Sequence, residues 1–330
     1  MKKTIAVLGA GNFGTVCAKF LAENGHDVQI WNWEGDQEPL REIGEYHENK
    51  TYLPGTTLPK NIIPKFSLEE VLRGADIVCY AVASTVLKQV FLQSVPLLEK
   101  DVIIVSLTKG MDKERVDIFP NIFAAAVEND MAHRIVTISG PAIAGQIAQK
   151  NVTVMAIAGK DSSAVSVVKE VCDNAYLRLI PTDDIIGVEL GGAFKNVYAI
   201  ALGICDGLGL GLNSKSALLA MAINEMAMVS VAMGGRPETL SGVAGLGDVI
   251  GTALSAESRN RRFGECLGKG MNTQKACETV QQTVEGIEST AIFLALAKKH
   301  NITTPIATMV QCAINGTRIT QEDIFALFTL

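Results

Sequence analysis

One lysine stands where a charged side chain is unexpected. Lys195 lies in GGAFKNVYAI, residues 191–200, whose other members are mostly small or apolar. A helix of this composition is buried nearly all round, and a buried ammonium is costly. Burial in general disfavours the charged form of a lysine, which makes it a proton donor and acceptor near neutral pH. We therefore predict that Lys195 is a general acid/base. A lysine that reaches the surface or pairs with Glu189 is the alternative.

Asp248 follows the glycine-rich turn GLG at residues 245–247. A carboxylate in that place is suited to bind a substrate hydroxyl or to orient Lys195. The alternative is that Asp248 only caps a loop.

A second lysine lies at the end of an apolar run. Lys109 follows DVIIVSL, residues 101–107, and Gly140 follows RIVTIS, residues 134–139. Ligands of open parallel sheets bind at the carboxyl ends of the strands. We therefore expect these two loops to face one crevice, unless Lys109 is only a solvated loop residue.

Histidine, the side chain that most often carries protons in catalysis, is scarce here. The chain has four, at positions 26, 47, 133 and 300, in turns, loops or polar segments. We expect them at the surface, which leaves the buried lysine as the candidate for acid/base chemistry.

The stretch SAESRNRRFG, residues 255–264, predicts an anion site. Ser258 or Ser255 is suited to cap a helix, and Arg259 and Asn260 would then add donors to the free backbone N–H groups of its first turn. A cation at a helix N-terminus opposes the helix dipole, unless an anion lies between them. The pattern favours a substrate that carries phosphate; arginines on a solvated face are the alternative.

The elements at the N-terminus are those of a dinucleotide-binding unit. The apolar run TIAVL leads into GAGNFG and then into the helical TVCAKFLAENG. In this context Gly9 permits the turn, Gly11 lets a pyrophosphate approach and Gly14 packs helix on strand. We predict a cofactor site at these glycines with Asn12 and Phe13; a turn that merely needs glycines is the alternative.

The choice between NAD and NADP stays open at the end of the next apolar run, IWNWE, residues 30–34. Asn32 is neutral and would tolerate a 2′-phosphate. No arginine follows to bind one, and Glu34 would repel it if it pointed inward.

The chain changes character near residue 182. Before that point apolar runs typical of buried parallel strands alternate with helical segments, and after it the pattern is helical. We predict an α/β protein with a Rossmann-type, doubly wound, mostly parallel sheet in residues 1–182 and an all-helical domain in residues 183–330.

Composition excludes several classes of function. A net charge of -6 and no basic run with aromatics argue against nucleic acid as a partner. The apolar run after MKK is too short for a signal sequence or a membrane span, so we expect a cytoplasmic protein without membrane insertion. The seven cysteines form no CxxC or His/Cys cluster, so we expect no metal. The small residues of the helical half could pack a homodimer or an internal core.

Several motifs together resemble one family. They are GAGNFGT, YLPG at 52–55, LTKG at 107–110, SGPAIA at 139–144, ELGGAFKNVYAIALGICDGLGLG, GLGD at 245–248, SRNRRFG and VEG at 284–286. Their order over nearly the whole chain is similar to that of the NAD(P)-dependent glycerol-3-phosphate dehydrogenases of the bacterial type. The resemblance implies reversible hydride transfer between sn-glycerol 3-phosphate and dihydroxyacetone phosphate, which supplies the backbone of glycerophospholipids. As the partner of the chain we expect a second copy, in a homodimer.

The resemblance also implies roles for single residues. Lys195 would be the general acid/base at the C2 oxygen, and Asp248 would lie near the substrate hydroxyls. The other substrate residues it implies are Lys109, Gly140, Ser258, Arg259 and Asn260, the last three for the phosphate. The other cofactor residues are Trp33, Lys109, Ala144, Arg259 and Glu285.

Three positions depart from the family pattern. Phe13 replaces a tryptophan, Trp33 stands where an arginine is common, and Ala142 stands where a serine is common. The second change weakens the case for NADPH, and the third removes a possible hydrogen bond to the substrate.

Two other functions fit part of the pattern. A related two-domain reductase, for a hydroxyacid or for ketopantoate, shares the glycine loop and a buried lysine but does not require the SRNR motif. A nicotinamide-sensing module without chemistry would keep GAGNFG and tolerate the loss of Lys195.

Overall fold

The computed structural model describes residues 1–255, 258–281 and 283–329. The chain divides into two compact units, residues 1–112 with 117–185 and residues 113–116 with 186–330. The sequence placed the boundary between residues 182 and 183. The short segment 113–116, between β6 (Met111–Asp112) and β7 (Asp117–Ile118), groups with the second unit. No pattern in the sequence predicted that residues 113–116 would belong to the second unit.

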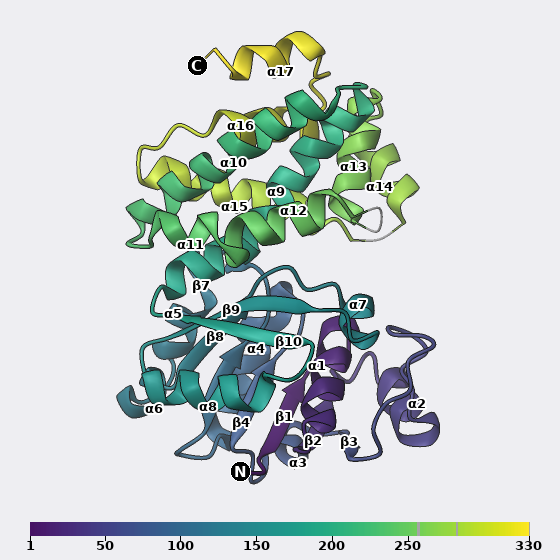
Figure 1. The fold of residues 1–330 in the computed structure, drawn as a ribbon, viewed down its shortest axis with the longest axis vertical. Coiled ribbons are helices and arrows are strands. Elements are labelled where there is room, and N and C mark those ends of the chain that lie inside the picture. Colours follow the sequence, from purple (N-terminus) through teal and green to yellow (C-terminus); the bar gives the residue numbers. More distant parts are fainter. Residues whose placement is uncertain (256–257, 282, 330) are drawn as a thin grey trace. The chain divides into compact units, whose positions relative to one another are not determined.

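The first unit is built on an eight-stranded sheet in the order β10-β9-β8-β5-β4-β1-β2-β3 (Figure 1). All neighbouring strands are parallel except β8 and β9. From β3 to β8 this is the strand order of a dinucleotide-binding fold, which confirms the predicted sheet. The strands are β1 (Thr4–Leu8), β2 (Asp27–Trp31), β3 (Ile62–Lys65), β4 (Ile77–Tyr80), β5 (Ile103–Ser106), β8 (Ile135–Ser139), β9 (Thr153–Gly159) and β10 (Leu177–Thr182).

Two of these strands were missed by the sequence patterns. β3 and β10 contain Pro64 and Pro181, and each lies at an edge of the sheet. Proline cannot donate a ladder hydrogen bond, so it is tolerated at edges but reads as a break in a sequence. The apolar runs that the sequence presents as strands before residue 182 form the other strands of the sheet.

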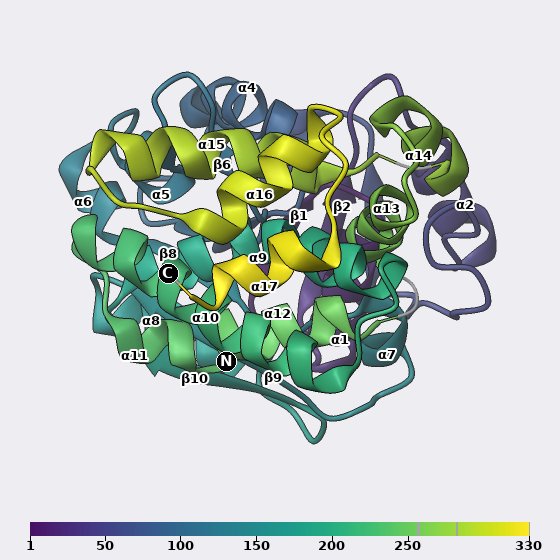
Figure 2. The ribbon, with the colours of Figure 1, turned by 90° about the horizontal axis from the view of Figure 1, so that it is seen from above.

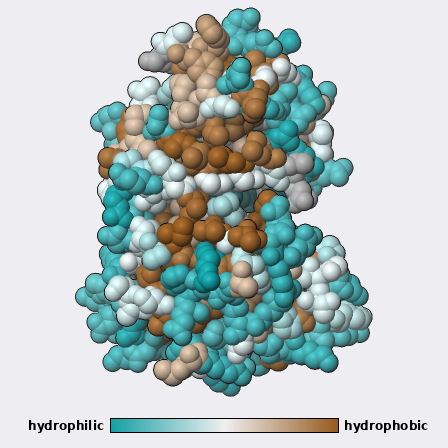
Figure 3. All heavy atoms as spheres, viewed as in Figure 1, coloured by the Kyte–Doolittle hydropathy of each residue, from teal (hydrophilic) through white to brown (hydrophobic). Residues whose placement is uncertain are grey.

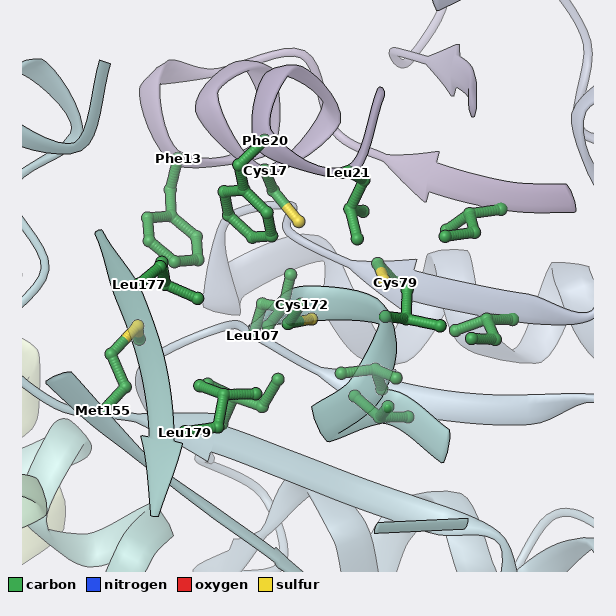
Figure 4. A pocket seen from close by; sticks show the side chains of 16 residues that line it. Phe13, Cys17, Phe20, Leu21, Cys79, Leu107, Met155, Cys172, Leu177 and Leu179 are labelled. Atoms are coloured by element: carbon green, nitrogen blue, oxygen red, sulfur yellow. The ribbon is translucent and has the colours of Figure 1, made fainter. Parts of the chain in front are cut away.

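Helices cover both faces of the sheet, as a doubly wound fold requires. One core cluster includes Val16 and Phe20 of α1 with Val168 of α8, and a second includes Leu87 and Phe91 of α4. Figure 4 shows the first cluster, where side chains of α1, β4 and α8 line an apolar pocket. The helices of this unit are α1 (Asn12–Glu23), α2 (Glu38–Tyr46), α3 (Leu68–Leu72), α4 (Ser84–Ser94), α5 (Phe119–Ala124), α6 (Asn129–His133), α7 (Ala144–Ala148) and α8 (Ser162–Cys172), with a 3₁₀ turn at Val95–Leu97.

The second unit is helical, as predicted, and α9 (Ile185–Gly207) is its central element (Figure 2). Phe194 and Tyr198 of α9 pack edge-on against Phe293 of α15. The remaining helices are α10 (Leu212–Ala232), α11 (Pro237–Ser241), α12 (Asp248–Ala253), α13 (Arg259–Gly268), α14 (Thr273–Val280), α15 (Glu285–Lys299), α16 (Pro305–Ile314) and α17 (Gln321–Leu327), with a π-helical turn at Val243–Gly247.

Glycines bring α9 and α13 into backbone contact. A Cβ at Gly203 would lie 2.1 Å from the carbonyl oxygen of Arg261, and one at Gly264 would lie 2.1 Å from that of Ile200. A Cβ at Gly207 would lie 2.3 Å from the carbonyl oxygen of Glu265, and one at Gly268 would lie 2.3 Å from that of Ile204. The spacing of four residues on both helices therefore fixes α13, and with it the SRNR motif, against α9.

Within the described residues, α9 and α10 are the helices whose length and apolar composition would allow them to cross a membrane. The apolar window of α9 is 83% buried inside the unit, which is typical of a core helix, whereas that of α10 is 39% buried. Leu212, Met228 and Val231 of α10 are exposed. Figure 3 shows apolar side chains gathered on the face of the helical unit that carries α10.

Candidate active site

Lys195 forms an ion pair with Asp248 across a distance of 2.6 Å from Nζ to Oδ1. The two side chains are 14% and 1% exposed. The structure thus pairs Lys195 with Asp248 and not with Glu189, the alternative partner considered from the sequence. Gly191, one turn before Lys195, makes this possible, because a Cβ there would lie 2.2 Å from the carbonyl oxygen of Ala244. The close approach places the start of α12 beside the lysine.

Further polar contacts of α9 and α13 reach the start of α15. The Asn196 amide donates to Oε2 of Glu285 at 3.4 Å, and the backbone N–H of Gly286 donates to Oδ1 of Asn260 at 2.9 Å. Asn260 is 7% exposed, so its amide is part of the packed interior. Sequence reasoning missed Asn196, although its position next to Lys195 was a possible signal.

Ser258 caps α13, because its side chain accepts from the backbone N–H of Arg261. The Arg261 guanidinium is held by Asp206 at 2.7 Å, and Asp206 also binds Lys215. In the part of the chain that the structure describes, the Arg259 side chain has no such partner. The first turn of α13 therefore presents a cation and free N–H groups, a combination that suits an anion.

In the first unit the structure brings Lys109 and Gly140 together. Lys109 Nζ donates to the carbonyl oxygen of Gly140 at 2.9 Å. They follow β5 and β8, neighbouring parallel strands, so both lie at the carboxyl edge of the sheet. Gly140 has φ of +149°, and a Cβ there would lie 3.0 Å from the Cα of Met155. The glycine is therefore needed for both backbone conformation and space.

The glycine loop has room for a dinucleotide. Gly9 has φ of +115°, and a Cβ at Gly14 would lie 1.9 Å from the carbonyl oxygen of Gly9. A Cβ at Gly11, which precedes α1, would meet no atom within 4 Å. Backbone N–H groups at the start of α1 are thus open to a pyrophosphate, so the residues present fit the cofactor. Asn12 is exposed there.

Phe13 and Ala144, two other predicted cofactor residues, pack against the core cluster that includes Val16 and Phe20. The Phe13 ring points into the apolar pocket beneath α1 (Figure 4). Ala144 begins α7 and packs on the core cluster of that face. The Phe13 and Ala144 side chains therefore belong to the packing beneath the glycine loop and the start of α7.

The end of β2 carries a network that sequence reasoning missed. Asn32, 6% exposed, donates through its amide to the carboxylate of Asp36, and Tyr52 donates to the same carboxylate. Trp33 is 56% exposed, and its ring lies over Gly35. The YLPG motif was a signal for Tyr52, but its partner could not be found without the turn geometry.

One histidine contradicts the expectation of surface histidines. His26 is 8% exposed, and its Nδ1 accepts from the backbone N–H of Lys3. Burial lowers its pKa. It precedes β2, at the amino end of the strands, away from the predicted loops. Among the described residues no group of His, Cys, Asp and Glu is suited to hold a metal ion.

Comparisons with known proteins match both units. Family models described as the N-terminus and the C-terminus of NAD-dependent glycerol-3-phosphate dehydrogenase match residues 4–165 and 184–324. The chain is 36% identical over 318 residues to a glycerol-3-phosphate dehydrogenase [NAD(P)+] of Bacillus velezensis, covering 96% of this chain and 92% of that protein.

Solved structures agree with this assignment. A crystal structure of glycerol-3-phosphate dehydrogenase from Coxiella burnetii matches with a TM-score of 0.90 and 34% identity, over 100% of this chain and 99% of that one. A ketopantoate reductase from Ralstonia eutropha matches with a TM-score of 0.59 and 14% identity over 96% of this chain and 97% of that one, which shows a shared fold alone. This chain therefore belongs to the family of NAD-dependent glycerol-3-phosphate dehydrogenases.

Proposed function

We propose that this enzyme catalyses reversible NAD(P)-dependent hydride transfer between sn-glycerol 3-phosphate and dihydroxyacetone phosphate. The observation that carries the proposal is the ion pair of Lys195 with the buried Asp248, on the same helical unit as the cation-bearing start of α13. Membership of the family supports the same reaction.

Lys195 is the proton carrier in this proposal. When bound, the dinucleotide supplies the hydride to C2 of the ketone or accepts it from the alcohol. In reduction the Lys195 ammonium gives a proton to the C2 oxygen, and in oxidation the neutral amine takes the hydroxyl proton. Oδ1 of the buried Asp248 lies 2.6 Å from Lys195 Nζ. Asp248 therefore positions the lysine while the two side chains remain paired.

The start of α13 binds the substrate phosphate. Ser258, Arg259 and Asn260 supply a hydroxyl, a guanidinium and an amide near the free N–H groups of the first turn. Binding the phosphate holds a short substrate in one orientation, and such remote binding energy is useful at the reacting carbon. Lys109 and Gly140 are the further substrate residues of this proposal.

The N-terminal unit binds the dinucleotide. Gly9, Gly11 and Gly14 form the loop, with Asn12 and Phe13 at the start of α1. The remaining cofactor residues are Trp33, Lys109, Ala144, Arg259 and Glu285, all of which are proposed from the family resemblance.

The enzyme would supply glycerol 3-phosphate for glycerophospholipids, in the cytoplasm. We also propose a homodimer, supported by the exposed Leu212, Met228 and Val231 of α10. Large apolar side chains exposed on a helix are typical of a surface that a second subunit covers.

A panel of ketones tests the proposed reaction. Purified enzyme is given reduced cofactor with dihydroxyacetone phosphate, dihydroxyacetone, ketopantoate or a 2-ketoacid, and cofactor oxidation is followed. We expect turnover with the phosphorylated ketone and a kcat/KM at least about a thousandfold lower without the phosphate, since the phosphate contacts are then unmade. Faster turnover of ketopantoate or a 2-ketoacid would contradict the assignment.

A further inference from the structure

We infer that Asp36, held in place by Asn32 and Tyr52, accepts the 2′-hydroxyl of the adenosine ribose and makes this enzyme select NADH over NADPH. The inference rests on the proposed binding of a nicotinamide dinucleotide at the glycine loop. It concerns Asn32 and Asp36, which follow β2, and Tyr52 of the YLPG loop. The sequence patterns left the contribution of Asn32 to the cofactor choice open and assigned no role to Asp36 or Tyr52.

The first observation is that the Asn32 amide links Asp36 to the glycine loop. Its Nδ2 donates to the carbonyl oxygen of Asp36 at 2.6 Å and to Oδ2 of Asp36 at 3.0 Å. Its Oδ1 accepts from the backbone N–H of Ala10, in the glycine loop, at 3.3 Å. The amide is therefore committed on both sides and has no donor left for a 2′-phosphate. It connects Asp36 directly to the loop that binds the pyrophosphate.

The second observation is the turn that carries the carboxylate. The backbone N–H of Asp36 donates to the carbonyl oxygen of Trp33 at 3.0 Å, which closes a turn over residues 33–36. At Gly35 a Cβ would lie 2.0 Å from the Trp33 ring, so only glycine lets the indole fold over the turn. The position of Asp36 is thus set by its own backbone as well as by Asn32.

The third observation is the support from the YLPG loop. Tyr52 Oη donates to Oδ2 of Asp36 at 2.8 Å. The backbone N–H of Tyr52 donates to Oδ1 of Asn49, whose Nδ2 donates to the carbonyl oxygen of Ala10 at 2.8 Å and to Thr15 Oγ1 at 2.7 Å. Asn49 is fully buried. The carboxylate is therefore fixed to the glycine loop from two sides.

The carboxylate still has capacity for a ligand. Both side-chain bonds to it end on Oδ2, and within the described residues nothing donates to Oδ1. The hydrogen bond to Asp36 raises the pKa of Tyr52, so the phenol remains a donor. An ionised carboxylate only accepts hydrogen bonds. A ribose hydroxyl can donate to Oδ1, whereas a 2′-phosphate would bring like charge against it.

Lysine and arginine side chains near Asp36 in the sequence or on the neighbouring strand contact other groups or point to one face of the sheet. Arg41 pairs with Glu38, and Lys50 lies over the ring of Tyr46. Lys65 is the register partner of Trp31, so both side chains point to one face of the sheet. Trp31, and with it Lys65, lies on the face of the sheet opposite the one that carries Val28 and Ile30. Asn32, the next residue, is instead bonded to the glycine loop.

The test compares kcat/KM for NADH and NADPH in the wild type and in Asp36→Asn, Tyr52→Phe and Glu34→Gln. We expect the wild type to favour NADH by at least about tenfold, and Asp36→Asn to reduce that ratio by at least about tenfold, mainly through better use of NADPH. Tyr52→Phe should give a smaller shift in the same direction. Glu34→Gln is the matched control, because it removes an exposed neighbouring carboxylate, and should leave the ratio unchanged.

Binding of each cofactor, measured by calorimetry on the same variants, separates this inference from the proposed reaction. Selective binding of NADH that is lost in Asp36→Asn, in a protein without turnover, would contradict the reaction but support the inference. Equal use of the two cofactors by the wild type, or an unchanged ratio in a folded Asp36→Asn variant, would overturn the inference and leave the reaction standing. Binding of neither cofactor would overturn both.

Discussion

At the scale of single residues, the Lys195–Asp248 pair shows why a charge can lie in an apolar helix. An ammonium and a carboxylate that are both largely buried stabilise each other only when the geometry is close, and here the atoms are 2.6 Å apart. Removing one partner would leave the other buried without compensation. The small residues of GGAFKN are part of this arrangement, because Gly191 admits the turn that ends at Asp248.

Glu225 is a second buried charge, away from the proposed chemistry. It is 2% exposed on α10 and accepts from the backbone N–H groups of Ile306 and Ala307, at the start of α16, and from the Tyr198 hydroxyl. Burial raises its pKa to about 7. The carboxyl is therefore protonated in the folded protein at a pH where the unfolded chain is already ionised.

A pH dependence of stability follows from Glu225. The contribution of its raised pKa is fully present below the unfolded value near 4.5 and is lost as pH rises through about 7. Since Gln does not titrate, Glu225→Gln should gain on the wild type by up to about 3 kcal/mol in free energy of unfolding between those pH values. Denaturant unfolding at pH 5, 6, 7 and 8 measures this, and parallel curves for the two proteins would contradict it.

At the scale of elements, α9 organises the helical unit. Its glycines face α13, its aromatic residues face α15, and Lys195 faces the start of α12. The relative positions of the proposed proton carrier and the proposed phosphate-binding turn therefore depend on backbone contact between α9 and α13. Such contact allows no added methyl group.

Gly264→Ala tests this packing. The new Cβ would lie 2.1 Å from the carbonyl oxygen of Ile200, so the helices must separate. We expect the free energy of unfolding to fall by about 1–3 kcal/mol. The KM for the phosphorylated substrate should also rise, because Arg259 and Asn260 move with α13.

Gly145→Ala is the matched control for stability. A Cβ at this helical glycine of α7 would meet no atom within 4 Å, and alanine is the better helix former. Thermal unfolding of both variants should give a lower Tm for Gly264→Ala and an unchanged or higher Tm for Gly145→Ala. Equal Tm values would refute the close-packing account.

Much of this architecture was readable from the sequence, for identifiable reasons. Continuous apolar runs, the glycine loop between strand and helix, and the change to helical pattern near residue 182 are local signals. β3 and β10 were not predicted, because each contains a proline, which reads as a break in a sequence although an edge strand tolerates it. The contacts of Asn196 with Glu285 and of Asp36 with Tyr52 join residues far apart in the chain or across a turn, so no local pattern contained them.

At the scale of the molecule, each unit holds one part of the proposed chemistry. The sheet unit contains the glycine loop and the Asp36 network proposed for the dinucleotide, while the helical unit contains Lys195 and the start of α13 proposed for the phosphate. The family match spans both units, since the two family models cover residues 4–165 and 184–324.

The most direct test of the central claim is turnover of dihydroxyacetone phosphate by the wild type and by Lys195→Ala, with reduced cofactor oxidation as readout. We predict turnover by the wild type and a kcat at least about a hundredfold lower in the variant, with cofactor affinity unchanged. Lys298→Ala, on the last turn of α15, serves as the matched lysine control and should behave as the wild type. A folded Lys195→Ala enzyme with a kcat near that of the wild type would contradict the assignment of the proton carrier.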